Sequence, residues 1–450
     1  MWVRAVFAVC VAAGCYHPTP PAGLPCSDPG HTCPGDQVCD LAQVPPTCVD
    51  ALAEADAGID GDAPPPTCAA GCPASAPICD PAGQTCRGCI ADSECPGACH
   101  ELDGTCTTPA QTLYVSPSGM DGAACTKTAP CRSINAAVQQ AAAGRRLIQV
   151  ADGTYTDGFN IRNNAIVSGM DRTPAGATIM VTGAGGVQAD ASTSSVIEGV
   201  SIVGAGSDGI INRGTLVVSR VLVSEARGRG MDNRGGDLIV LDARVERCDG
   251  TGIQSNNNVR IERTVVFDNA GTGIIANGAS TILNTIVGSN GTMTGGSPGG
   301  VKLSPSVGDM VVFRFNTLSE NDVQAGGVTG IQCDGAVMLE NSIFADVDGV
   351  FTTETGGSCS ARYSMFDAMP LAGPGNFAGN PMFVNASNDF HLAAGSPAID
   401  KADPAATETL DVDGDARPAG TARDIGADET TFAPAAPVLR GSAEPSLARP

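Results

Sequence analysis

The sequence contains few charged and few aromatic residues. Charged residues make up 16% and aromatic residues 4% of the 450 residues, whereas glycine occurs 57 times and proline 31 times. This composition excludes a helical bundle or a coiled coil, which need charged helix faces and few turns. It is typical of a β protein with many turns. The length allows two or three domains of ~150 residues, or one elongated repeat architecture.

Basic residues are scarce as well, and nearly all of them are arginine. There are 25 basic and 48 acidic residues, so the net charge is -23, and the only lysines are Lys127, Lys302 and Lys401. We therefore exclude a nucleic acid as a partner, because binding to phosphates needs a cationic surface.

The N-terminus contains the only candidate for a targeting segment. Residues 1–14 have one positive charge at Arg4 and then an apolar run too short to cross a membrane, which is typical of a cleaved export signal. Residues 12–15 (AAGC) resemble a bacterial lipobox, in which the cysteine is acylated. We expect Cys15 to anchor an exported protein at the outer membrane or the cell surface. An ordinary secretory signal is the alternative, because Ala12 stands where leucine is usual.

Twelve of the 19 cysteines lie between Cys26 and Cys106. Export places them in an oxidising compartment, so we expect two disulfide-rich modules whose pairing cannot be read from spacing. Residues 50–66, between the modules, are rich in acid, alanine and proline and predict an extended linker. Residues 15–110 would thus form a lipidated stalk. Zinc is the alternative for Cys86 and Cys89, which have Cys-x₂-Cys spacing.

Of the seven other cysteines, Cys10 is removed with the signal and Cys15 is the lipidation site, so five remain, which predict two disulfides and one thiol. Cys125 and Cys131 are close enough to pair across a turn, and Cys333 with Cys359 could staple a loop. This leaves Cys248 as a buried free thiol. A nucleophilic role for Cys248 is disfavoured because all four histidines lie outside the repeats that contain it, namely His17, His31, His100 and His391.

A loose repeat begins near Arg145. A glycine followed by an apolar residue recurs at spacings of 21, 22 and 21 residues, at Gly209, Gly230, Gly252 and Gly273. A second column of small or β-branched residues has the same period, with spacings of 21, 22, 21 and 21 at Val200, Val221, Ala243, Thr264 and Thr285. Two columns with one period make coincidence improbable.

This period matches one turn of a parallel β-solenoid, since helical repeats usually need about 33 residues. The column from Val200 to Thr285 is expected to point inward and to stack at about 4.8 Å per coil. The glycines fit either a turn with positive φ or a close approach of two backbones. Leucine-rich repeats are the main alternative, but their leucine pattern is absent. One outward column, Arg220, Asp242, Arg263 and Asn284, predicts ion pairs between neighbouring rungs.

The start of the repeat region resembles a known family. LYVSPSG (113–119), APCRSI (129–134) and IQVADGTY (148–155) are similar to the opening of right-handed parallel β-helix proteins of the pectate-lyase-like superfamily. The resemblance implies a helix that covers the first coil. Ser133 can cap a helix that runs through Ala143 and ends at Gly144, with Ile134 and Val138 on its apolar face.

The other end resembles the terminal module of choice-of-anchor Q proteins, a likeness carried by NPMFV (380–384), DFHL (389–392), GSPAID (395–400), DVDGDARP (411–418) and DIGADE (424–429). We therefore expect a β-helix over residues 111–379, a C-terminal module over 380–430 and a disordered tail over 431–450. The resemblance makes residues 411–418 a structural turn, with Arg417 available to pair with a carboxylate.

Catalytic groups are hard to find in this sequence. The motifs of the hydrolases in the pectate-lyase-like superfamily are absent. A lyase site would have to draw on acidic residues from different coils. The candidate acids are Asp208, Asp232, Asp237, Asp242, Glu246 and Asp249, with Arg244 and Arg247 nearby. Asp411, Asp413 and Asp415 are spaced like the first ligands of a calcium loop. Ala416 and Ala422 stand where an EF-hand needs glycine and glutamate.

Aromatic side chains gather late in the chain and are expected to stack inside the last coils, at Phe313, Phe315, Phe344, Phe351, Tyr363 and Phe366. Leu222, Val265 and Ile286 are candidates for an outward apolar stripe that a loop or a partner covers.

The sequence therefore predicts an all-β, right-handed parallel β-helix with an N-terminal capping helix, preceded by a disulfide-rich stalk. Its expected role is attachment or recognition of a glycan or envelope protein at the membrane, without catalysis and without a cofactor. A calcium-assisted polysaccharide lyase and an envelope scaffold are the alternatives.

Overall fold

The computed structural model describes residues 37–40, 47–50, 68, 71–80, 85–100, 104–181, 183, 185–292, 298–323, 328–345 and 353–430. Residues 1–14, Cys15, Cys26, Cys33 and the tail 431–450 lie outside the described residues, as does most of the linker. The chain divides into two units, Met1–Asp62 and Ala63–Pro450. In the first unit, β1 (Gln37–Asp40) pairs with β2 (Thr47–Asp50) as an antiparallel hairpin.

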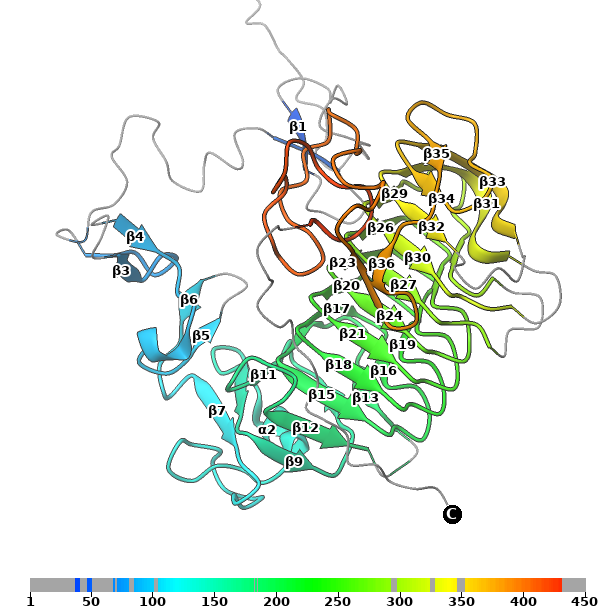
Figure 1. Cartoon of the computed structure of the whole chain (residues 1–450). Helices are drawn as coiled ribbons and strands as arrows, with labels where there is room; N and C mark the ends of the chain where they lie inside the picture. The colour runs from blue at the N-terminus through cyan, green and yellow to red at the C-terminus, as the bar shows by residue number, and fades with distance from the viewer. Residues whose placement is uncertain are drawn as a thin grey trace, which may run out of the picture. The chain divides into compact units, whose positions relative to one another are not determined.

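The second unit is dominated by a parallel β-solenoid with three faces (Figure 1). The first face contains seven short strands, which are β10 (Asn160–Ile161), β13 (Val187–Ala189), β16 (Ile210–Asn212), β19 (Met231–Asn233), β22 (Ile253–Ser255), β25 (Ile274–Ala276) and β28 (Val301–Leu303).

In most coils the second-face strand comes directly after the first-face strand, separated from it by a sharp turn. The second face contains β7 (Thr112–Val115), β8 (Leu147–Val150), β11 (Ile166–Gly169), β14 (Ser194–Glu198), β17 (Thr215–Ser219), β20 (Leu238–Leu241), β23 (Val259–Glu262), β26 (Ser280–Leu283) and β29 (Val311–Arg314). Two long strands, β31 (Val328–Glu340) and β33 (Thr353–Arg362), run through the corner and join the first two faces into one 18-stranded sheet.

The third face is a separate 11-stranded sheet. Its strands are β9 (Gly153–Tyr155), β12 (Ala177–Met180), β15 (Val200–Val203), β18 (Leu222–Ser224), β21 (Arg244–Glu246), β24 (Val265–Phe267), β27 (Ile286–Gly288), β30 (Thr317–Ser319), β32 (Ile343–Ala345), β34 (Met365–Phe366) and β35 (Phe377–Ala378).

The register confirms the predicted stacking. Ser201 of β15 lies opposite Leu222 of β18, which lies opposite Arg244 of β21, so the residues before them, Val200, Val221 and Ala243, also stack. All members of this inward column are at most 5% exposed. Burial of each valine or isoleucine contributes roughly 1.5–3 kcal/mol, and the stacked sum offsets the chain entropy.

The glycine column is explained by close backbone approach. A Cβ added at Gly230 would lie 2.3 Å from Val245 Cγ1 and 2.6 Å from the carbonyl oxygen of Gly252, and Gly209, Gly252 and Gly273 meet equivalent obstacles. None of these four glycines has a positive φ. The column therefore marks the place where one coil touches the next, and the alternative of a left-handed turn is wrong.

The capping helix is shorter than the sequence predicted. Helix α2 spans Ile134–Gln140, and the hydroxyl of Ser133 accepts a hydrogen bond from Ala136 N, as expected for the cap. The helix ends before Ala143 because the chain must reverse to enter β8. It does so in a turn in which Ala142 and Arg145 exchange hydrogen bonds and Gly144 has a φ of +81°. Its apolar face closes the N-terminal end of the core.

The second cysteine-rich module, residues 68–106, belongs to the same compact unit as the solenoid. It contains two antiparallel hairpins, β3 (Ile78–Asp80) with β4 (Thr85–Arg87) and β5 (Cys99–His100) with β6 (Thr105–Cys106), and a short 3-10 helix η2 (Asp92–Glu94). The part of the expected stalk that the structure describes here therefore packs against the solenoid through Ala98, which contacts Leu147 and Ile166.

The C-terminal module covers Val265 and Ile286, two of the three residues of the predicted outward apolar stripe. It contains the hairpin β36 (Phe383–Asn385) with β37 (Asp389–Leu392) and lies over β24 and β27 (Figure 1). Phe390 packs with Ile286 and Val265, as the sequence analysis expected of a covering loop. A hydrogen bond of 2.9 Å from Ala427 N to Thr317 Oγ1 also joins the module to β30.

The late aromatic residues divide between the core and this covered face. Phe313, Phe344 and Phe366 stack inside the last coils, with ring centroids 6.3 and 5.1 Å apart. Phe315 instead packs with the C-terminal module, under the guanidinium of Arg417. The prediction that Phe315 points inward is wrong, because its φ of +51° places it in the turn between the second and third faces. Phe351 lies outside the described residues.

We expect Gly230→Ala to lower the free energy of unfolding by about 1–3 kcal/mol, because the new methyl group must displace a neighbouring coil. The matched control is Gly183→Ala, at a glycine that has nothing within 4 Å of an added Cβ. Urea denaturation followed by circular dichroism would compare the two. Equal stability of both variants would contradict the proposed role of the glycine column.

Candidate functional site

Acidic side chains on the outside of the solenoid are held by arginines. Five of them each lie between two arginine side chains. Eight of these ten ion pairs have N–O distances between 2.5 and 3.6 Å. The sets are Glu198 with Arg172 and Arg220, Asp232 with Arg229 and Arg234, Glu246 with Arg244 and Arg247, Glu262 with Arg260 and Arg263, and Glu340 with Arg314 and Arg362. A calcium ion at any of these carboxylates would have to displace an arginine.

The acids considered for a lyase site do not converge. Asp208 and Asp232 share Arg234 at 2.6 and 2.5 Å on the first face. Asp242 accepts two hydrogen bonds from Arg263, and Glu246 lies at the end of a third-face strand. Asp237 instead accepts a hydrogen bond of 3.0 Å from Asn258. The structure thus distributes these acids over separate places instead of one groove.

The predicted outward column occupies the turn between the second and third faces. Arg220, Asp242, Arg263 and Asn284 have φ values of 52°, 52°, 45° and 48°, in the left-handed region. Arg263 and Asp242 form the expected pair between rungs at 2.6 Å. Arg220 reaches back to Glu198 on the preceding rung at 3.5 Å.

Two shallow depressions lie at the corners of the early coils. One is lined by Arg146, Asn163 and Asn164 beside the end of α2, and the other by Asn164, Thr193 and Arg213. Neither contains an acid, a histidine or a cysteine, so neither brings together a proton donor and a base.

The three aspartates that resemble a calcium loop form a turn. Asp411 is fully buried, and its two carboxylate oxygens accept hydrogen bonds from the backbone N–H groups of Asp413, Asp415 and Glu429 at 2.7–3.0 Å. Asp415 is exposed. Among the described residues these three carboxylates do not gather around one point, so the calcium interpretation has no geometric support.

Arg417 holds this turn to residues 424–429. Its guanidinium is 4% exposed, lies 3.1 Å from a carboxylate oxygen of Glu429 and donates to the carbonyl oxygens of Leu410, Asp424, Gly426 and Ala427. The pairing with a carboxylate is the one that the family resemblance implied. With its donors used inside the module, Arg417 is a structural residue.

His391 is the titratable centre that the sequence analysis did not single out. Its Nε2 lies 2.8 Å from Asp413 Oδ2 and its Nδ1 2.5 Å from Asp389 Oδ1. Hydrogen bonding to Asp413, together with the charges of Asp428 and Asp389, raises the pKa of His391 to about 10. Burial raises the pKa of Asp428 to about 6.

The donor atoms of His391, Asp413 and Asp428 lie within 4.8 Å of one another, close enough to hold a metal ion. The proton on His391 already supplies the positive charge that these carboxylates need. We therefore interpret this cluster as an ion-paired link between β37 and the turn at residues 411–415.

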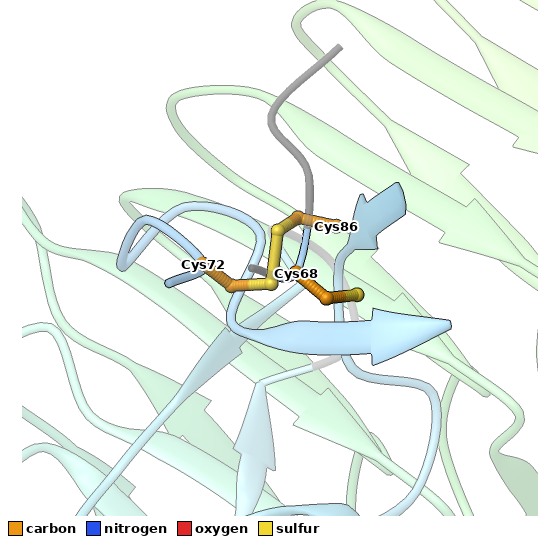
Figure 2. Close-up of side chains that lie close together, drawn as sticks. All are labelled: Cys68, Cys72 and Cys86. Atoms are coloured by element: carbon orange, nitrogen blue, oxygen red, sulfur yellow. A yellow bond between two sulfur atoms is a disulfide. The ribbon is translucent and has the colours of Figure 1, made fainter. Parts of the chain in front are cut away.

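In the second cysteine-rich module, disulfides and not zinc explain the clusters of cysteines. Cys68–Cys79, Cys72–Cys86, Cys89–Cys99 and Cys95–Cys106 are bonded, so each run of four cysteines pairs first with third and second with fourth. Figure 2 shows the bond between Cys72 and Cys86 beside Cys68. Because Cys86 and Cys89 have different disulfide partners, they are not zinc ligands.

The solenoid cysteines pair as the sequence analysis expected, Cys125 with Cys131 and Cys333 with Cys359, and Cys248 is a buried thiol. Cys248 precedes a ladder of buried asparagines, Asn269, Asn290 and Asn321, and its N–H donates to Asn269 Oδ1. Burial raises the pKa of Cys248 to about 11, so the thiol is a poor nucleophile.

A scan against protein-family models and a search of curated proteins give no match. Among solved structures, the crystal structure of pectate lyase Pel9A is similar to this chain, with a TM-score of 0.43 and 18% identity over 71% of this chain and 96% of that one. The parallel β-solenoid itself is established by the strand pairing. No described helix has the length and apolar character needed to span a membrane.

We expect His391 to stabilise the fold in a pH-dependent way. The folded pKa of about 10 lies above the ordinary value of 6.5, so the contribution is full below pH 6.5 and is lost as the pH rises towards about 10. His391→Gln keeps a donor for Asp413 but removes the charge. It should lower the free energy of unfolding by about 1–2 kcal/mol near pH 6.5.

Urea denaturation of both proteins at pH 6.5 and near the folded pKa of about 10 measures this difference. Asp428, with a pKa of about 6, is mostly ionised in the wild-type protein over this range, so the change with pH comes mainly from His391. A difference that stays constant between the two pH values would show that the charge of His391 has no role.

Proposed function

We propose that the protein is an exported, lipid-anchored β-solenoid that recognises a glycan or an envelope protein without catalysing a reaction. The observation that carries the proposal is the bracketing of outward acids by pairs of arginines. A catalytic base or a calcium ligand needs a carboxylate that is free to accept a proton or an ion. In this chain these carboxylates are already paired with arginines, between coils at Glu198 and Glu340 and within one coil at the other three.

The turns that follow the first-face strands offer a surface suited to a repeating ligand. Four residues follow one another on consecutive rungs: Arg213, Arg234, Asn256 and Asn277. The backbone N–H groups of the last three donate to the carbonyl oxygens of Asn212, Asn233 and Ser255, which directly precede the first three in the chain. Asn277 Nδ2 also donates to Asn256 Oδ1 at 3.0 Å. Rungs repeat at about 4.8 Å, so this column presents hydrogen-bonding groups at regular intervals along a straight line.

The lipid anchor is proposed for Cys15 on the lipobox-like sequence of residues 12–15. Two or three acyl chains hold a protein at a membrane far better than one, because each buried CH₂ contributes about 0.8 kcal/mol. The membrane would then be one partner, and a glycan or an envelope protein the other.

Metabolic labelling with a radioactive fatty acid tests the anchor. We expect the wild-type protein to carry the label and Cys15→Ala to lack it, because acylation requires the thiol. Cys248→Ala is the control, since that thiol is buried. An unlabelled wild type, or equal label on Cys15→Ala, would contradict the anchor.

Glycan arrays and pull-downs from envelope extracts test recognition. Incubation with polyuronates, with and without calcium, tests the lyase alternative, because a lyase would form an unsaturated product that absorbs light. We expect binding that Arg234→Ala with Asn256→Ala weakens, and no turnover. Calcium-dependent turnover abolished by Asp232→Asn would overturn the proposal. The absence of any ligand in arrays and pull-downs would favour an envelope scaffold.

A further inference from the structure

Outward side chains on the first four strands of the second face form a row that is buried although it lies outside the core. Tyr114, Gln149, Ser168 and Glu198 stack in register on β7, β8, β11 and β14. Their neighbours in the chain, such as Leu113 and Ile148, fill the core, so this row points away from it. All four members are at most 4% exposed. We call them the polar row.

The second cysteine-rich module covers the polar row. Arg172 connects the two, because its Nη1 lies 2.5 Å from Glu198 Oε1 and its Nη2 lies 2.5 Å from Asp92 Oδ1 of the module. The same Nη2 donates to the carbonyl oxygen of Cys99 at 2.6 Å. The apolar part of the contact is small and consists of Ala98 against Leu147 and Ile166, with Val196 at its edge.

The covered state leaves hydrogen-bonding groups unsatisfied. Gln149 is 2% and Ser168 0% exposed, yet Gln149 Nε2 and Ser168 Oγ have no hydrogen-bond partner among the described residues. A buried donor without a partner has lost its water and gained nothing in exchange, which disfavours the covered state. By contrast, the cover that the C-terminal module forms over Ile286 is apolar on both sides.

We propose that the second cysteine-rich module is a displaceable cover and that the polar row beneath it is a concealed binding site for a hydroxyl-rich glycan. Apart from the chain connection into β7 and the hydrogen bond of 2.9 Å between the hydroxyls of Thr107 and Thr112, the module is held by one arginine-centred contact and a few apolar atoms. Its disulfides keep it intact when it moves away from the row. Once uncovered, Tyr114, Gln149 and Ser168 present a phenol, an amide and a hydroxyl on successive rungs, groups that pair with sugar hydroxyls. This binding step rests on the recognition function proposed above.

Two variants weaken the cover from opposite sides. Arg172→Met removes the guanidinium from the solenoid, and Asp92→Asn removes the charge from the module but keeps the oxygen that accepts Cys99 N. The control is Arg162→Met, which breaks the exposed Arg162–Asp190 ion pair on a neighbouring coil. We expect hydroxyl-radical labelling of Tyr114 to rise several-fold in both variants and to stay unchanged in the control.

Tyr155 is the internal reference for this experiment. It is 5% exposed, similar to Tyr114 at 4%, but it belongs to the solenoid core, so its protection shows that a variant is folded. If Tyr114 stays as protected as in the wild type in both variants, the module is a fixed part of the fold and the inference is wrong.

Glycan arrays then test the site. We expect Arg172→Met to bind glycans more tightly than the wild type, and a second change, Gln149→Ala, to remove the gain. If the wild type binds and the uncovered variant binds no more tightly, recognition uses another surface; the proposed function then stands and this inference falls. If neither protein binds a glycan while Tyr114 becomes accessible, the concealed site is refuted too.

Discussion

The register of one coil on the next is the constraint on which the molecule depends. Parallel strands about 4.8 Å apart place equivalent residues directly above one another, so a residue that suits one rung is repeated on the next. The inward column from Val200 to Thr285 forms the core in this way. The same register brings the glycines from Gly209 to Gly273 so close to the next coil that a side chain would not fit.

Stacking also governs the charges. Like charges on adjacent rungs would repel, and the chain avoids this by placing arginines on the rungs before and after single acids, as at Glu198 and Glu340. This arrangement explains why arginine is so frequent and lysine so rare: a planar guanidinium can hydrogen-bond to a carboxylate while its stem lies along the coil. It also leaves the five bracketed acids paired with arginine, which is the reason for proposing recognition over catalysis.

A solenoid exposes three faces, and this chain covers parts of two of them with its own segments. Over β24 and β27 the cover is apolar and completed by the buried Arg417, so it is a permanent part of the fold. Over β8 and β11 the cover rests on Arg172, and donors beneath it lack partners. The difference in polarity between the two contacts separates a structural lid from a displaceable one.

The sequence by itself determined the solenoid, because the spacing of about one coil appears directly in the columns of glycine and β-branched residues. It also determined the cap at Ser133 and the pairs Cys125–Cys131 and Cys333–Cys359, but not the pairing within the cysteine-rich module. It could not determine where α2 ends, since the reversal into β8 is a demand of the sheet. Nor could it show that Asp413 meets His391, that Asp411 binds backbone amides, or that Arg172 meets Asp92. Those contacts join residues far apart in the chain or depend on how segments without a repeat fold against the coils, and only the tertiary structure decides them.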